Sequence, residues 1–127
     1  MDDERTRLRD LSARLLRLHA VLLERERHAY EASHGSVSPR ELLQLLLGHE
    51  RFAWLRALSQ LIVRIDEAVD ARNPETPLDA DTLLRDTERL VRSPSEEVFA
   101  TRYAAALQDS VDVVLAHAEV VKSLGVR

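Results

Sequence analysis

Regularly spaced leucines near the start of the chain place the strongest constraint on its fold. They recur at intervals of three and four residues, at Leu8, Leu11, Leu15, Leu18 and Leu22. Such spacing aligns side chains along one side of an α-helix, which then has to bury that side. The pattern predicts a helix from about Asp3 to Ser33, followed by Gly35, whose backbone can take the left-handed conformation that ends many helices.

A second helix is predicted from Ser38 to about Arg72. The segment SPRE at its start places a serine before the helix, a proline in its first turn and a glutamate three residues after the serine. This pattern is typical of helix N-termini. The two prolines of NPETP, residues 73–77, end the helix, because proline has no N–H to donate and disfavours helix in the preceding residue.

Two more helices complete the prediction. The third runs from Asp79 to Arg92, with Asp79 or Asp81 as its capping residue. The fourth opens with a second Ser-Pro-x-Glu at Ser93 and continues to about Leu124. Four amphipathic helices joined by short connections indicate an all-α fold, an antiparallel four-helix bundle of three long helices and one short helix. With 127 residues, the chain is expected to form a single helical-bundle domain over residues 1–127.

Charge and composition argue against several functions. A formal net charge of −4 opposes nucleic-acid binding, which depends on clustered basic residues. The chain has no cysteine and a single lysine, Lys122, which argues against thiolate and lysine-nucleophile chemistry. No apolar run approaches the roughly 18 residues of a membrane span, and the opening MDDERTRLRD lacks the apolar segment of a signal peptide. We therefore expect a cytoplasmic protein without nucleic-acid or membrane partners.

The second predicted helix is apolar around most of its circumference after Gly48. Its apolar residues form a candidate interface: Phe52, Trp54, Leu55, Leu58, Leu61, Ile62 and Ile65. A helix of this kind is buried on most sides, so it either lies at the centre of the chain's own bundle or contacts a second copy in a dimer. Gly48 weakens a helix and indicates a bend or the close approach of another helix, whereas His49 falls on the narrow polar strip and is expected in solvent.

Four polar residues fall on or beside apolar helix faces, where an unpaired charge is costly. They are His19 and Glu26 of the first helix and Glu50 and Arg51 of the second. We expect them to form one buried polar cluster that sets the register of the helices or binds a small ligand. A second apolar-face histidine, His117, is expected near the far end of the bundle, too far from His19 to share a metal ion.

No segment has the residue types and spacing of a known catalytic or metal site. HERFA, residues 49–53, has Ala53 where the zinc motif H-E-x-x-H requires its second histidine. EASH, residues 31–34, is a single Glu-x-x-His, whereas a di-iron bundle needs two. The acidic neighbours of His28 oppose a phosphorylated histidine. We therefore expect no catalytic residue, no metal and no cofactor.

The segments FAWLRALSQLIVRIDE, residues 52–67, and DVVLAHAEVVKSL, residues 112–124, resemble segments of small uncharacterised bacterial all-helical proteins. The resemblance covers about a quarter of the chain and implies a helical fold without an activity. The function expected from the sequence is a non-enzymatic protein-interaction or regulatory module that binds a second copy or another protein. The alternative is a ligand- or metal-binding bundle that uses the buried His/Glu/Arg cluster.

Overall fold

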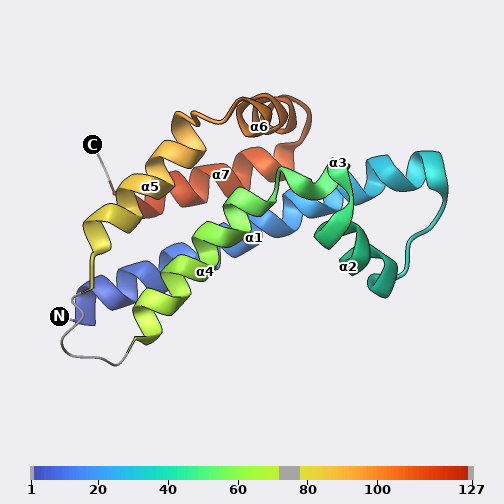
Figure 1. Cartoon of the computed structure of the whole chain (residues 1–127). Helices are drawn as coiled ribbons and strands as arrows, with labels where there is room; N and C mark the ends of the chain where they lie inside the picture. Colours follow the sequence, from blue (N-terminus) through green and yellow to red (C-terminus); the bar gives the residue numbers. More distant parts are fainter. Residues whose placement is uncertain (1, 72–77, 126–127) are drawn as a thin grey trace.

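The computed structural model describes residues 2–71 and 78–125, and every regular element in these residues is a helix (Figure 1). The all-α prediction is thereby confirmed. The first helix, α1, spans Asp2–His34, close to the predicted range. It ends at Gly35, which has a φ of 85° and donates its N–H to the carbonyl of Glu31 at 2.8 Å.

The predicted second helix is divided into three: α2 (Pro39–Gly48), α3 (Glu50–Ala53) and α4 (Arg56–Asp70). Its start is as predicted, because the Ser38 hydroxyl accepts the N–H of Glu41 at 3.2 Å. The prediction that it is one continuous helix was wrong. The predicted end at Arg72 and the segment NPETP lie outside the described residues.

The break after α2 lies at His49, where the backbone is extended (φ −87°, ψ 136°). The imidazole Nδ1 accepts the N–H of Arg51 at 3.0 Å and so caps α3. A β-carbon at Gly48 would meet no atom within 4 Å. Of the two explanations for this glycine, a bend agrees with the structure, and close approach of another helix does not.

The predicted third helix is α5 (Ala80–Arg92), capped by Asp79, which accepts the N–H of Thr82 at 3.1 Å. The predicted fourth helix is instead divided into α6 (Glu97–Asp109) and α7 (Val111–Ser123). Ser93 ends α5 and does not start the next helix. Glu96 caps α6 and Ser110 caps α7, so the expectation of three long helices and one short helix was wrong.

α1 lies between α4 and α7, α5 contacts both of these helices, and α6 crosses them, so that Figure 1 shows it end-on. α1 and α7 are antiparallel: Arg7 donates to the Leu124 carbonyl at 2.7 Å at one end, and Arg25 binds Asp109 beyond the other. The largest fully buried side chains come from five of the helices and the turn before α4: Leu8, Leu11, Leu15, Leu18, Leu22, Phe52, Leu55, Leu58, Ile65, Phe99, Val113 and Val120.

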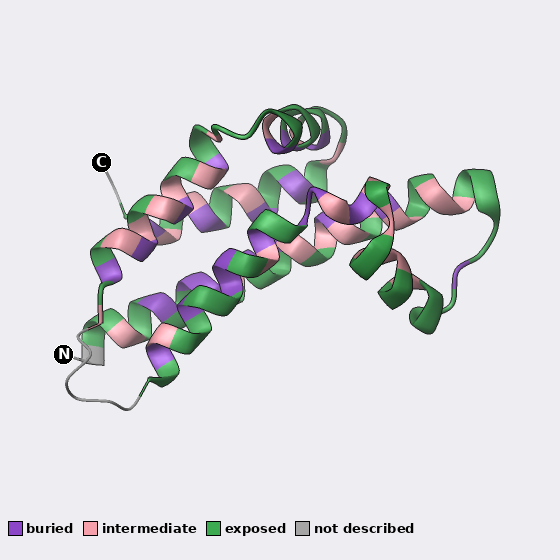
Figure 2. Ribbon diagram, in the orientation of Figure 1, coloured by how far each residue is buried: buried purple, intermediate pink, exposed green. Residues whose placement is uncertain are grey.

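The last turns of α1 and the whole of α2 project from this core, and most of their surface is exposed (Figures 1 and 2). Aromatic contacts hold the two sides of the projection together. The Tyr30 ring stacks on His34 with centroids 4.0 Å apart and meets the edge of His49 at 5.4 Å. His49 also contacts Phe52 and is half-buried, so the expectation that it lies in solvent was wrong.

Candidate functional site

The most buried charged side chain is Glu26 of α1, which is 2% exposed. Its carboxylate lies 3.1 Å from the Arg25 guanidinium and 3.7 Å from that of Arg51. Arg25 also donates to both carboxylate oxygens of Asp109, at 2.8 and 2.6 Å. These four residues, here called the Glu26 cluster, connect α1 to α3 and to the end of α6.

The Glu26 cluster differs from the four-residue cluster expected from the sequence. Glu26 and Arg51 lie together, but Glu50 is exposed, because the break at His49 changes the phase of the residues that follow it. His19 is half-buried and takes no part in the cluster; its Nε2 is buried without a hydrogen-bond partner among the described residues. Burial lowers the pKa of His19 below its usual value, which favours a neutral ring.

The Arg25–Asp109 pair of the Glu26 cluster consists of fixed charges. The hydrogen bond from Arg25 lowers the pKa of Asp109, and the same bond raises the pKa of Arg25. Groups held in their charged states at neutral pH are poor proton donors or acceptors in catalysis. The arrangement therefore suits a role in positioning helices, and it does not bring together the ligand set that the alternative function requires.

Arg25 and Asp109, the pair that joins α1 to α6, were not predicted from the sequence. They are 84 residues apart, and no periodicity connects them. The one available signal is local: Arg25 directly precedes an acidic residue on an apolar helix face, where a cation is the expected neighbour.

The seven candidate interface residues all lie inside the chain's own core. Phe52, Leu55, Leu58 and Ile65 have no exposed surface, and Trp54, Leu61 and Ile62 are at most 6% exposed. Of the two alternatives for this segment, burial within a single chain therefore accounts for every one of these side chains. They do not form a surface on which a second copy could dock.

The exposed apolar side chains lie elsewhere. α2 contains Leu42, Leu43, Leu45, Leu46 and Leu47, and none of its residues is buried. α7 exposes Val111, Val114 and Leu115 on the side away from the core. The sequence carried a signal for α2, since leucines at these five positions occupy more than one side of a helix.

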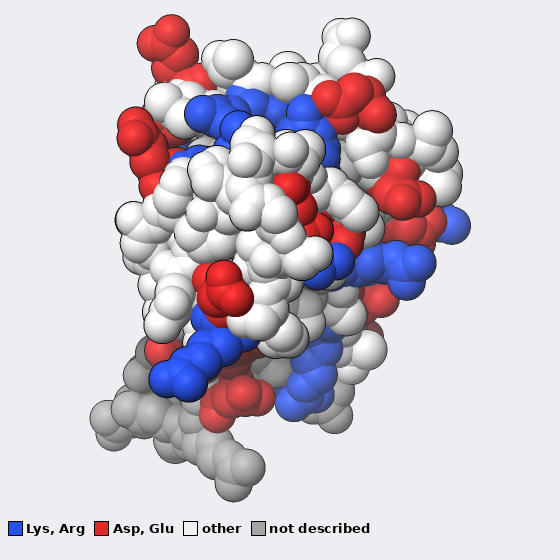
Figure 3. Space-filling view, turned by 90° about the vertical axis from the view of Figure 1, so that its right-hand side faces the viewer, with Lys and Arg blue, Asp and Glu red and all other residues white. Residues whose placement is uncertain are grey.

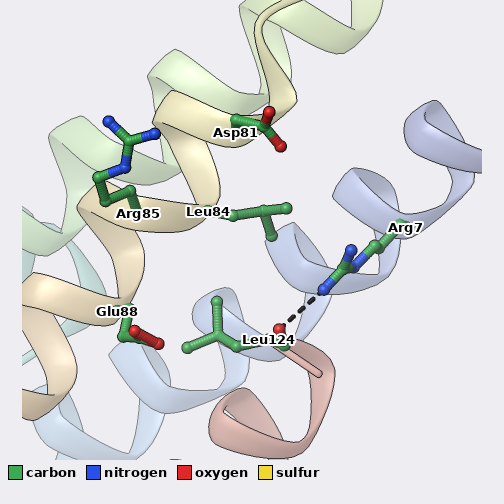
Figure 4. A pocket seen from close by; sticks show the side chains of 6 residues that line it. All are labelled: Arg7, Asp81, Leu84, Arg85, Glu88 and Leu124. Carbon is green, nitrogen blue, oxygen red and sulfur yellow. Dashed lines mark hydrogen bonds between the residues drawn. The ribbon is translucent and has the colours of Figure 1, made fainter. Parts of the chain in front are cut away.

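A hollow between α1, α5 and the end of α7 is lined by charges of both signs (Figure 4). One of its two arginines, Arg7, donates a hydrogen bond to the Leu124 carbonyl, and Asp81 and Glu88 lie on the opposite wall. This hydrogen bond satisfies a carbonyl at the helix C-terminus that has no partner within the helix. We interpret this hollow as the place where the last turn of α7 is attached to α1.

Within residues 2–71 and 78–125, no group of three or more His, Asp or Glu side chains is placed to hold a metal ion. The Glu-x-x-His pair is used locally: Glu31 accepts the N–H of Val37 at 2.7 Å, and the His34 ring lies 3.1 Å from the Tyr30 carbonyl. Among the described helices, none is both long and apolar enough to cross a bilayer.

Comparisons with protein-family models, with curated proteins and with solved structures find no match to the chain. No relative's activity or partner can therefore be carried over to it.

Proposed function

We propose that the protein is a non-enzymatic interaction module that self-associates through α2. The observation that carries the proposal is that α2 has five leucines and no buried residue. Leu43 and Leu47 are 56% and 70% exposed and lie one helical turn apart on the same side. Full burial of a leucine side chain stabilises by about 1.5–3 kcal/mol, a gain that the single chain does not obtain at these positions.

The surface around α2 supports this proposal. Figure 3 views this end of the molecule, and its centre is largely uncharged, with most of the Lys, Arg, Asp and Glu side chains around it. An apolar centre within a polar rim is the usual composition of a protein interface.

The charges beside α2 favour a second copy as the partner. Leu43 and Leu47 are equally far from Leu45 in sequence, so two α2 helices that cross antiparallel at Leu45 place each Leu43 against the partner's Leu47. Arg40 lies in the first turn of α2 and Glu50 lies directly after its end, so the same antiparallel arrangement brings Arg40 near the end of the partner's α2, where Glu50 lies. Both are exposed and form no ion pair within the described chain.

We propose further that α1, α4, α5 and α7 constitute a four-helix bundle that carries α2 as its docking element. The contacts of α1 with α4 and α7, and of α5 with both, support this assignment. In this arrangement the bundle supplies stability and α2 is free to bind, since no α2 residue is part of the buried core.

Light scattering after gel filtration tests the proposal. The natural chain is expected to be a dimer at tens of micromolar, a range typical of weak association. The double variant Leu43→Glu/Leu47→Glu should be a monomer with unchanged helical circular dichroism. Leu16→Glu is the matched control, because Leu16 is 58% exposed on the side of α1, and it should remain a dimer.

Charge reversal tests the antiparallel register separately. Arg40→Glu and Glu50→Arg should each weaken the dimer, and the two together should restore it. A natural chain that is monomeric at 100 micromolar, a concentration at which micromolar affinity gives mostly dimer, refutes self-association. The choice of α2 is refuted if the chain forms a dimer that is disrupted by Leu115→Glu on α7 but not by the α2 double variant.

A further inference from the structure

A second surface, independent of α2, is built on a buried tyrosine–histidine pair. Tyr103 of α6 is 2% exposed, and its hydroxyl lies 2.6 Å from Nδ1 of His117 on α7. Burial raises the pKa of Tyr103, so the hydroxyl keeps its proton, and we assign it as the donor in this bond. Burial and the nearby Arg92 lower the pKa of His117, so the ring is neutral at neutral pH.

With Tyr103 assigned as the donor, the proton of the neutral His117 ring lies on the other nitrogen. A neutral imidazole that accepts at Nδ1 carries its hydrogen on Nε2. This N–H points away from Tyr103, and His117 is half-buried at the surface. The pair therefore presents a fixed hydrogen-bond donor at the edge of α7.

This donor borders a shallow hollow between the end of α5 and α7, here called the basic hollow. It is lined by Arg92, His117, Ala118, Val121 and Lys122. No carboxylate lines it, whereas four other hollows on the described chain each include at least one Asp or Glu. Neither Arg92 nor Lys122 forms an ion pair with a described residue.

We propose that the basic hollow binds a small carboxylate with an apolar tail. The Arg92 guanidinium matches the two oxygens of a carboxylate, and Lys122 and the His117 Nε2–H supply further donors. Val121 and Ala118 form an apolar wall beside these donors, which suits an aliphatic or aromatic tail. Two cations line this hollow and no carboxylate does, which favours an anionic ligand.

Nuclear magnetic resonance tests the proposal with hexanoate as the probe. The chain has five histidines, and the Cε1–H signal of His117 can be assigned by comparison with His117→Gln. Hexanoate should shift this signal with saturation, and hexylamine and 1-hexanol should not. Inorganic phosphate should bind more weakly than hexanoate, because it gains nothing from Val121 and Ala118.

Charge-removing variants locate the site. Arg92→Gln and Lys122→Gln should each weaken hexanoate binding about threefold, and about tenfold together, as for exposed charge pairs. Arg89→Gln is the matched control, because Arg89 lies on the last turn of the same helix but lines a different hollow; it should leave binding unchanged. Equal weakening by Arg89→Gln, saturable binding of 1-hexanol, or phosphate that binds as tightly as hexanoate would overturn the proposal.

Discussion

The Glu26 cluster allows the cost of one buried charge to be predicted. Replacing Glu26 by glutamine keeps the shape of the side chain but removes its charge, and with it a charge-assisted hydrogen bond to Arg25 at 3.1 Å. Hydrogen bonds to charged groups contribute about 1.5–3 kcal/mol. The Arg25 and Arg51 side chains are 26% and 38% exposed, so water partly replaces the lost carboxylate. We therefore expect Glu26→Gln to lower the free energy of unfolding by about 1.5 kcal/mol.

Glu50→Gln is the matched control, because it makes the same chemical change at an exposed residue of α3. Its effect should stay within about 0.5 kcal/mol, as for other surface substitutions. Arg51→Gln should cost less than about 1 kcal/mol, because its contact with Glu26 is a partly exposed ion pair at 3.7 Å. Equilibrium urea unfolding, followed by circular dichroism, measures all three variants. Equal losses in the two glutamate variants, or a Glu26→Gln variant as stable as the natural chain, would refute this account.

Two further predictions concern the backbone and acid. Gly35→Ala should lower the free energy of unfolding by about 1 kcal/mol, because Gly35 has a φ of 85°. Gly48→Ala should leave stability unchanged or raise it, because open space surrounds that position and alanine favours helix. Thermal unfolding compares the two variants. Arg25 lowers the pKa of Asp109 below 3.8, so this pair stabilises the fold above that pH and loses its effect as the pH falls through the folded-state pKa. The stability difference between the natural chain and Asp109→Asn should be constant from about pH 7 to 5 and shrink below about pH 4; a constant difference down to pH 2 would contradict this reasoning.

Local signals in the sequence were sufficient for the helical class and for the starts of α1, α2 and α5. The five leucines of the α1 stripe lie on one side of the helix, and none of them has exposed surface. Ser38 caps α2 as predicted, and Asp79, one of the two expected caps, caps α5. A cap depends on residues only a few positions apart. Such interactions are local, so they can be read before the chain is folded.

Tertiary contacts determined where the helices break and which apolar residues remain uncovered. His49 lies between α2 and α3, where it contacts Tyr30 of α1 and Phe52 of α3. The contact with α1 exists only in the folded chain. Helical phase shows how much of a helix is apolar, but it does not show whether the same chain or another covers that side. For this reason Trp54 and Leu58 were assigned to a candidate interface although they lie in the core, and the exposed leucines of α2 were recognised only in the folded chain.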